Sequence, residues 1–204
     1  LARLGVRPEV LSGEEEAALA YSGAVRGLPD AARPVLVVDV GGGSTELILG
    51  DTAVTASHSM DIGSVRLHER HLHSDPPTAE EIAACVADID AHLDACPVDA
   101  ADGATVVGVA GTFTSVAAGV LDLTAFDADA IDHARLPMAA VHDLCERLVA
   151  MTVSERLELG WMHPGRADVI DAGALIVSRV LARTSAPHLV IAEADILDGI
   201  AWSI

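Results

Sequence analysis

The sixteen residues VLVVDVGGGSTELILG, from Val35 to Gly50, decide how the rest of the sequence is interpreted. Two short runs of Val, Ile and Leu flank three consecutive glycines, a pattern typical of a strand, a turn and a second strand. Because glycine lacks a Cβ atom, such a turn can take a positive φ angle and bring its backbone N–H groups close to a ligand. The stretch therefore predicts a β-hairpin whose turn cradles phosphate oxygens. The same residues also suit a plain glycine hairpin that carries two surface acids.

The polar residues of this hairpin extend the phosphate hypothesis. Asp39 ends the first run and Glu46 opens the second, and carboxylates are hard oxygen ligands suited to Mg²⁺ that is carried with a phosphate substrate. No lysine follows the glycines, so the GxxxxGK[ST] loop of nucleotide-binding proteins is excluded. The groups predicted to bind phosphate oxygens belong to Gly41, Gly42, Gly43, Ser44 and Thr45.

Composition limits the kind of partner this chain can have. The chain has 204 residues, of which 51% are hydrophobic, so it is long enough to bury a substantial core. Its 12 basic residues are all arginine and face 31 acidic residues, which gives a net charge of −19. A chain this acidic repels extended polyanions and argues against nucleic-acid binding. An anionic substrate must instead be held locally by backbone amides, a metal ion and a few arginines.

The apolar runs and the cysteines bear on location. Each apolar run is shorter than the roughly 18 residues that cross a bilayer, and the start LARLGVRPEV has no signal-peptide stretch. We therefore expect a cytoplasmic protein that is not bound to a membrane. Cys85, Cys96 and Cys145 form an odd and widely spaced set, which indicates buried, reduced thiols rather than disulfides or a zinc site.

Secondary-structure signals alternate along the chain. Two capping boxes, Ser12 with Glu15 and Thr78 with Glu81, predict helices that run to about residue 26 and about residue 93. Further strands are predicted at 53–60, 105–110 and 188–192, and further helices at 63–73, 111–121, 139–150, 154–160, 166–183 and from 194. The region 124–137 has no clear pattern. This alternation predicts an α/β fold with a mixed sheet.

Five segments, in order along the chain, resemble one family. They are EVLSGEEEA at 9–17, VVDVGGGSTE at 37–46, IGSVRLHE at 62–69, VAGTFTSVA at 109–117 and GRADVIDAGALIV at 165–177. Together they are similar to the exopolyphosphatase and guanosine pentaphosphate phosphohydrolase family, a branch of the actin, sugar kinase and Hsp70 superfamily. The resemblance implies an actin-like ATPase (ribonuclease H-like) lobe, in which helices flank a mixed β-sheet.

The same resemblance implies a domain organisation. Members of the family have an N-terminal lobe with its own phosphate loop, and the active site lies in the cleft between the lobes. By this resemblance, residues 1–30 form the crossing segment and the helix at the cleft, and residues 31–204 form the C-terminal lobe. The chain would then hold half of an active site. The missing lobe is its expected partner, and a homodimer is a further expectation.

The resemblance also assigns a role to Glu16, as the base that activates the attacking water. Helix geometry agrees, because Glu15 is occupied by the capping box whereas Glu16 shares a face with the small residues Ala20 and Ala24. The alternative is that three glutamates in a first turn only complement the helix dipole.

Two more groups are candidate phosphate ligands. Gly111 and Thr112 lie where a strand passes into a helix, and the exposed amides of a helix start favour an anion, although a plain turn has the same pattern. Arg66 and Arg166 fall in family-like segments, and a guanidinium group fits phosphate oxygens. Either arginine would serve equally in a structural ion pair. His68, His71 and His73 are interpreted as a solvated helix face rather than as a metal site.

These residues predict a Mg²⁺-dependent hydrolase that releases terminal phosphate from polyphosphate or guanosine pentaphosphate. Two alternatives remain open at this point. One is a sensor or binding module that holds a phosphorylated nucleotide without turning it over. The other is a kinase of the same superfamily.

Overall fold

A mixed six-stranded sheet forms the centre of the chain. The computed structural model describes residues 11–28, 30–194 and 196–203. The sheet has the order β3-β2-β1-β4-β6-β5, in which β1, β4 and β6 are parallel and the other neighbours are antiparallel. The strands are β1 (Val35–Val40), β2 (Thr45–Gly50), β3 (Val54–Met60), β4 (Thr105–Val109), β5 (Arg135–Pro137) and β6 (His188–Ile191).

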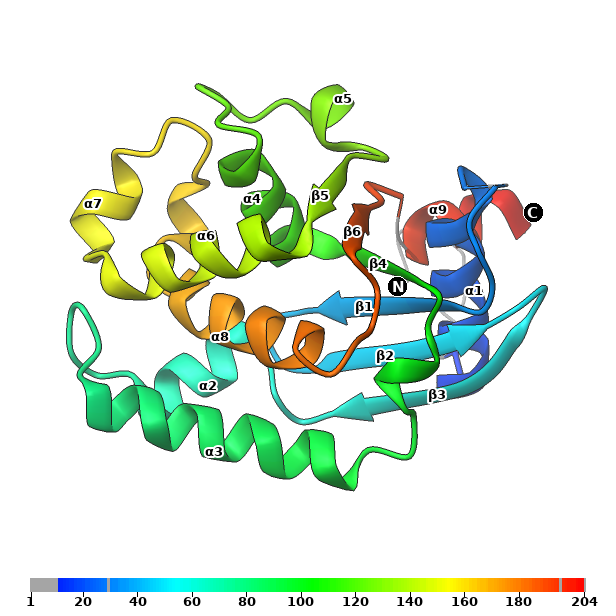
Figure 1. The fold of residues 1–204 in the computed structure, drawn as a ribbon, viewed down its shortest axis with the longest axis horizontal. Helices are drawn as coiled ribbons and strands as arrows, with labels where there is room; N and C mark the ends of the chain where they lie inside the picture. Colours follow the sequence, from blue (N-terminus) through cyan, green and yellow to red (C-terminus); the bar gives the residue numbers. More distant parts are fainter. Residues whose placement is uncertain (1–10, 29, 195, 204) are drawn as a thin grey trace, which may run out of the picture.

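Helices cover both faces of this sheet (Figure 1). The helices α1 (Gly13–Arg26) and α9 (Ile196–Ser203) lie together on one face and pack on each other. The other face carries α2 (Ser64–His71), α3 (Ala79–Ala95), α4 (Ala110–Val120), α5 (Ala128–Ile131), α6 (Met138–Ala150), α7 (Val153–Leu157) and α8 (Ile170–Leu181). This arrangement confirms the predicted α/β fold with helices flanking a mixed sheet.

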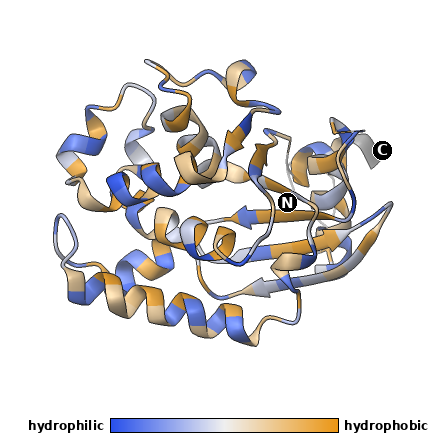
Figure 2. Cartoon of the chain, in the orientation of Figure 1, coloured by the Kyte–Doolittle hydropathy of each residue, from blue (hydrophilic) through white to orange (hydrophobic). Residues whose placement is uncertain are grey.

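Alternation along β1 explains the two layers. Leu36, Val38 and Val40 are buried in the larger core beneath α2, α3, α4, α6 and α8. Val35 and Val37 are buried in a smaller core against α1. Successive side chains of a strand point to opposite faces, so Asp39 lies on the α1 face of the sheet. Figure 2 shows hydrophobic residues along the central strands β1 and β2, whereas the edge strand β3 is more polar.

Most predicted elements are confirmed, with their starts and ends shifted by a few residues. Both capping boxes form: the side chains of Ser12 and Thr78 accept the N–H groups of Glu15 and Glu81, and each glutamate returns the bond. The helix predicted from residue 166 begins only at Ile170, because Pro164–Arg166 forms a separate 3-10 turn. The region 124–137 contains α5 and the short edge strand β5, which single-sequence patterns did not indicate.

The fold brings three chain segments to one edge of the sheet. Parallel strands β1, β4 and β6 end at this edge, where the β1–β2 turn, the start of α4 and the residues after β6 follow. Ligands of open α/β sheets bind at the carboxyl ends of parallel strands. The glycine turn and the start of α4 are therefore neighbours, although about 70 residues separate them in the chain.

Candidate functional site

The glycine turn rests on the start of α2. The carbonyl of Gly41 accepts the N–H of Ser64 at 2.9 Å, and the carbonyl of Gly42 accepts the N–H groups of Val65 and Arg66 at 3.0 and 3.1 Å. Gly63 makes this approach possible, because a Cβ atom there would lie 2.5 Å from the carbonyl carbon of Gly42. The carbonyl side of the turn is thus covered by protein.

The amide side of the turn is different. Gly41 donates its N–H to the carbonyl of Ser44 at 3.0 Å, which closes the turn and removes this amide from the predicted phosphate ligands. Among the residues the structure describes, the N–H groups of Gly42, Gly43 and Ser44 have no hydrogen-bond partner, and both glycines are exposed. Amides that protein leaves unbonded at an exposed turn are ready donors to an anion.

The two threonines of the predicted set have structural roles for their hydroxyls. Thr45 is fully buried and its hydroxyl donates to the carbonyl of Ile62 at 2.6 Å. Thr112 is also buried, and its hydroxyl donates to the carbonyl of Val40 at 3.1 Å. Both hydroxyls therefore bond backbone carbonyls inside the protein. The prediction that the Thr45 hydroxyl binds phosphate is wrong, because this hydroxyl is buried and already bonded. The burial of these side chains was not visible in the sequence.

Gly111 and Arg166 come together as one unit. A Cβ atom on Gly111 would lie 2.5 Å from Nε of Arg166 and nearer still to the rest of the guanidinium group. The guanidinium of Arg166 therefore lies flat on the first turn of α4. It makes no hydrogen bond or ion pair with any residue in the described part of the chain. The alternative of a structural ion pair is thus not what this arginine forms here.

These groups surround one small pocket of about 250 Å³. The turn contributes Gly41 and Gly42, α4 contributes Gly111 and Thr112, and Arg166 also lines the pocket. Ala110, which precedes Gly111, has a positive φ of 68°, a conformation that non-glycine residues hold only when their surroundings impose it. A guanidinium, a helix start and the unbonded amide of Gly42 give this pocket positively polarised donors in an otherwise acidic chain.

Arg66 holds the turn from its other end. Its Nε donates to the carbonyl of Gly43 at 2.7 Å, and its Nη2 lies 3.5 Å from a carboxylate oxygen of Asp61. The side chain is 43% exposed. Arg66 is therefore bound to the turn itself and to an acid, and its first role here is to fix the backbone of Gly43.

A second pocket, of about 540 Å³, collects the predicted acids. Asp39 and Glu46 are cross-strand partners on the α1 face, and Glu16 lines the same pocket from the first turn of α1. The Glu16 side chain is exposed, whereas Glu15 is held by Ser12, whose backbone N–H lowers the pKa of the Glu15 carboxyl. The pocket thus brings all three predicted acids together.

The pair of strand acids suits a magnesium ion. Directly opposed residues of an antiparallel pair have Cβ atoms about 5 Å apart. The Ser59 hydroxyl donates to Oε1 of Glu46 at 2.6 Å and orients that carboxylate. Mg²⁺ is usually held by one or two carboxylates plus waters and substrate phosphates, which this pair can provide. No cluster of three or more His, Cys, Asp or Glu side chains suited to a metal occurs among the described residues, so the ion would depend on water and substrate for its other ligands.

Sequence reasoning missed a buried polar group behind the glycine turn. Arg156 is fully buried and its Nη1 lies 3.2 Å from Oδ2 of Asp171, which is 2% exposed. Nδ1 of His68 lies 3.2 Å from the other oxygen of Asp171. His68 therefore faces the interior rather than solvent, and His71 contacts Asp88 at 2.8 Å, so the predicted solvated histidine face is wrong for both. Asp171 and Arg156 carry no local motif that distinguishes them from surface charges.

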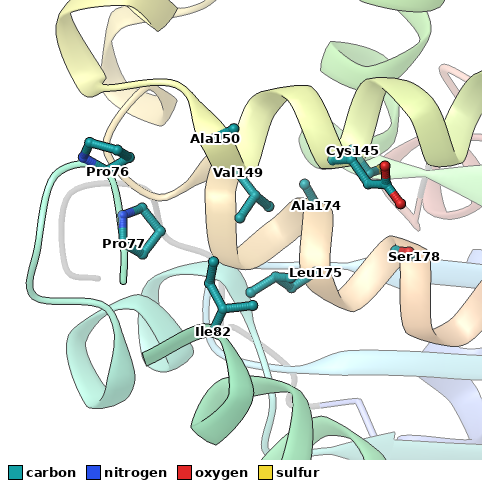
Figure 3. A pocket seen from close by; sticks show the side chains of 10 residues that line it. Pro76, Pro77, Ile82, Cys145, Val149, Ala150, Ala174, Leu175 and Ser178 are labelled. Atoms are coloured by element: carbon teal, nitrogen blue, oxygen red, sulfur yellow. The ribbon is translucent and has the colours of Figure 1, made fainter. Parts of the chain in front are cut away.

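An apolar pocket of about 450 Å³ lies elsewhere on the lobe (Figure 3). It is lined from α3, α6 and α8 by side chains such as Ile82, Val149 and Leu175, with Pro76 and Pro77 at its rim. None of the predicted site residues borders it. Burial also raises the pKa of its Cys145 thiol to about 12, which makes this cysteine a poor nucleophile.

The fold and the site together define one class of protein. A mixed sheet of this order, with a glycine hairpin and a helix start at its carboxyl edge, is a lobe of the actin-like ATPase fold. The family model of the Ppx/GppA phosphatase family matches residues 2–203. The chain belongs to this family.

Individual relatives agree with this assignment. Exopolyphosphatase 2 of Mycobacterium tuberculosis is 46% identical over 208 residues, which cover 98% of this chain and 65% of that protein. Exopolyphosphatase 1 of Mycobacterium leprae is 30% identical over 176 residues, which cover 84% of this chain and 52% of that protein. The chain thus spans less than two thirds of the length of these curated relatives.

Solved structures give the same fold. A crystal structure of an exopolyphosphatase-like protein superposes with a TM-score of 0.93 at 42% identity, and covers 98% of this chain and 68% of its own. The type II variant of the Aquifex aeolicus Ppx/GppA phosphatase superposes with a TM-score of 0.84 at 30% identity, and covers 96% of this chain and 64% of its own.

Among the described residues, no helix is long and apolar enough to cross a membrane.

Proposed function

We propose that this chain supplies the phosphate-binding half of a hydrolase that releases terminal phosphate from inorganic polyphosphate. The observation that carries the proposal is the guanidinium of Arg166 on Gly111, in one pocket with Gly42, whose backbone N–H has no hydrogen-bond partner among the described residues. These groups offer fixed donors to phosphoryl oxygens without a broad basic surface. The names of the exopolyphosphatase relatives support polyphosphate as the substrate.

The residues divide the chemistry between the two pockets. The turn amides, the start of α4 and Arg166 hold phosphate oxygens and disperse the charge that develops during transfer. Asp39 and Glu46 would hold Mg²⁺ or its waters, and the ion supplies further charge neutralisation when it is bound. Glu16, on the wall of the acidic pocket, accepts the proton of the attacking water as the phosphoanhydride bond breaks.

One experiment tests this function. A two-lobed protein that contains this chain is incubated with triphosphate and Mg²⁺, and released phosphate is measured. Glu16→Gln is expected to lower kcat by about 10²–10⁴-fold, the usual contribution of a general base. Glu14→Gln removes the same charge from the same helix turn and the same pocket, and is expected to retain much more activity than Glu16→Gln. If the two variants lose activity equally, Glu16 only complements the helix dipole.

A pocket beside the phosphate site favours guanosine pentaphosphate as a second candidate substrate. This pocket, of about 560 Å³, shares Gly111 and Arg166 with the phosphate pocket and is lined by Phe126, Trp161 and Met162. An aromatic and apolar wall next to phosphate ligands suits a nucleobase better than a bare phosphate chain. Faster phosphate release from guanosine pentaphosphate than from triphosphate would favour the nucleotide.

The same assays separate the remaining classes of function. A sensor or binding module would bind triphosphate without releasing phosphate from it, and Glu16→Gln would then change nothing. A kinase would consume ATP only when an acceptor is added.

A further inference from the structure

The glycine turn is closed by its own Gly41–Ser44 hydrogen bond, and its carbonyls are held by α2. Ser64, Val65 and Arg66 donate their N–H groups to the carbonyls of Gly41 and Gly42, and the Arg66 side chain holds Gly43. A small rotation of α2 would therefore turn the peptide groups of the turn. Because the carbonyl and N–H of a peptide share one plane, the N–H groups of Gly42 and Gly43 would turn with them.

Polar side chains link α2 to two neighbouring helices: His68 contacts Asp171 of α8, and Arg70 and His71 contact Asp88 of α3. His68 lies one helical turn after Ser64, and its Nδ1 is 3.2 Å from Oδ1 of Asp171 in the first turn of α8. The His68 side chain is 26% exposed and the Asp171 side chain is 2% exposed, so this contact lies at the inner side of α2. Helices α2 and α8 pack on each other along this contact.

Asp171 is itself held rigidly. Its second carboxylate oxygen accepts from Nη1 of the fully buried Arg156, and its first also accepts the N–H of Ala172 at 2.7 Å. Arg156 is anchored in turn by the carbonyls of Leu148 at 2.9 Å and Ala167 at 3.0 Å. Burying such a pair gives little net stability, because desolvation offsets the attraction between the charges. The fixed carboxylate of Asp171 is better explained by its contact with His68 of α2.

Helix α8, which carries Asp171, also packs closely against two residues that bond the hairpin. A Cβ atom on Gly173 would lie 2.8 Å from Cγ2 of Thr112 and 3.5 Å from Cβ of Ser64. Both of those residues also donate a hydroxyl to the backbone of the hairpin, at Val40 and Gly41 respectively. The first turn of α8 therefore contacts the two residues that bond the hairpin from below.

We propose that His68, held by Asp171 and Arg156, is a positioning residue that sets the orientation of the glycine turn through α2. His68 is too far along α2 to bond the turn itself, and acts only through the helix. The inference rests on the proposed function for its effect on phosphate binding, but its structural core concerns α2 and the turn alone. It is therefore testable without a ligand.

The test compares two substitutions at one position. In His68→Asn the side-chain amide nitrogen occupies the place of Nδ1 and can still donate to Asp171, whereas in His68→Leu a methyl group takes that place. Hydrogen exchange of the amides of Ser64, Val65 and Arg66 is followed by NMR in the 204-residue chain, because these amides bond the turn carbonyls. Glu69→Leu, at an exposed neighbour on the same helix, is the matched control.

His68→Leu is expected to speed exchange at these amides about tenfold, the effect of one lost charge-assisted hydrogen bond, while Asn and the control keep the wild-type rates. Unchanged rates in His68→Leu would overturn the proposal, and so would equal rates in the Asn and Leu variants. Calorimetry with triphosphate and Mg²⁺ gives a second readout, in which only the Leu variant is expected to lose about tenfold in affinity. If the wild-type chain binds no triphosphate, the proposed function fails, but the exchange rates still decide the role of His68.

Discussion

Replacing Gly111 by Ala tests the pocket formed by Gly41, Gly42, Gly111 and Arg166 without replacing a charged residue. The new Cβ atom would lie 2.5 Å from Nε of Arg166, closer than any ordinary contact. The end of a flexible arginine side chain yields more easily than helix backbone, so we expect the guanidinium to leave the pocket. Alanine is favoured over glycine in a helix by up to about 1 kcal/mol, so the free energy of unfolding should hold or rise slightly.

The loss of binding follows from the displaced group. A hydrogen bond to a charged group contributes roughly 1.5–3 kcal/mol, which corresponds to about 10- to 150-fold in affinity. Gly111→Ala is therefore expected to weaken triphosphate binding by at least about tenfold, as is Arg166→Gln. Since both changes remove the same guanidinium, the double variant should be hardly weaker than either single variant.

Two measurements on each variant decide the matter. Calorimetry with triphosphate and Mg²⁺ gives the affinity, and urea unfolding gives the stability. Wild-type affinity in Gly111→Ala, or losses that add in the double variant, would mean that Arg166 does not bind phosphate from its place on Gly111. A large loss of stability would show that the backbone of α4 moves instead of the arginine.

Two further predictions concern stability. Arg156→Met leaves the Asp171 carboxylate buried without the Arg156 guanidinium and is expected to lower the free energy of unfolding in urea by roughly 3–5 kcal/mol. Adding Asp171→Asn should recover much of this loss. A loss below about 1 kcal/mol would mean that the pair is solvated. The backbone N–H of Thr78 lowers the pKa of Glu81 from its ordinary 4.5 to about 2, so its capping stabilises the fold above pH 4.5 and is lost as pH falls towards 2. Glu81→Gln should accordingly lower Tm at pH 7, with the difference shrinking as pH falls through that range, and a difference independent of pH would contradict the assignment.

The fold was largely predictable because its signals are local. The capping boxes at Ser12 and Thr78 mark where two helices begin, and the β-branched runs and glycines mark the hairpin. Each of these signals depends on residues only a few positions apart. The edge strand β5 was missed because its three residues gain their strand character only from pairing with β6. Pairing between distant segments leaves no periodic trace in so short a stretch.

The candidate site was predictable in its membership but not in its assignments. The sequence singled out Gly42 and Arg166, and the structure places both on one pocket. It did not show that the Thr45 hydroxyl is buried or that the Gly41 amide closes the turn, since both depend on tertiary contacts. Asp171 was missed for a related reason, because its contacts are with Arg156 and His68, which lie 15 and 103 positions away in the chain.

The claim that an oxyanion binds at the turn is tested most directly by an NMR titration of the ¹⁵N-labelled chain with triphosphate and Mg²⁺. Saturable shifts are expected for the amide resonances of Gly42, Gly43 and Gly111, because Gly42 and Gly111 line the pocket with Arg166 and Gly43 belongs to the turn. Resonances of residues around the apolar pocket, such as Leu175, should stay in place. Saturable shifts confined to other residues, or no shifts at the three glycines, would show that the oxyanion does not bind at the turn.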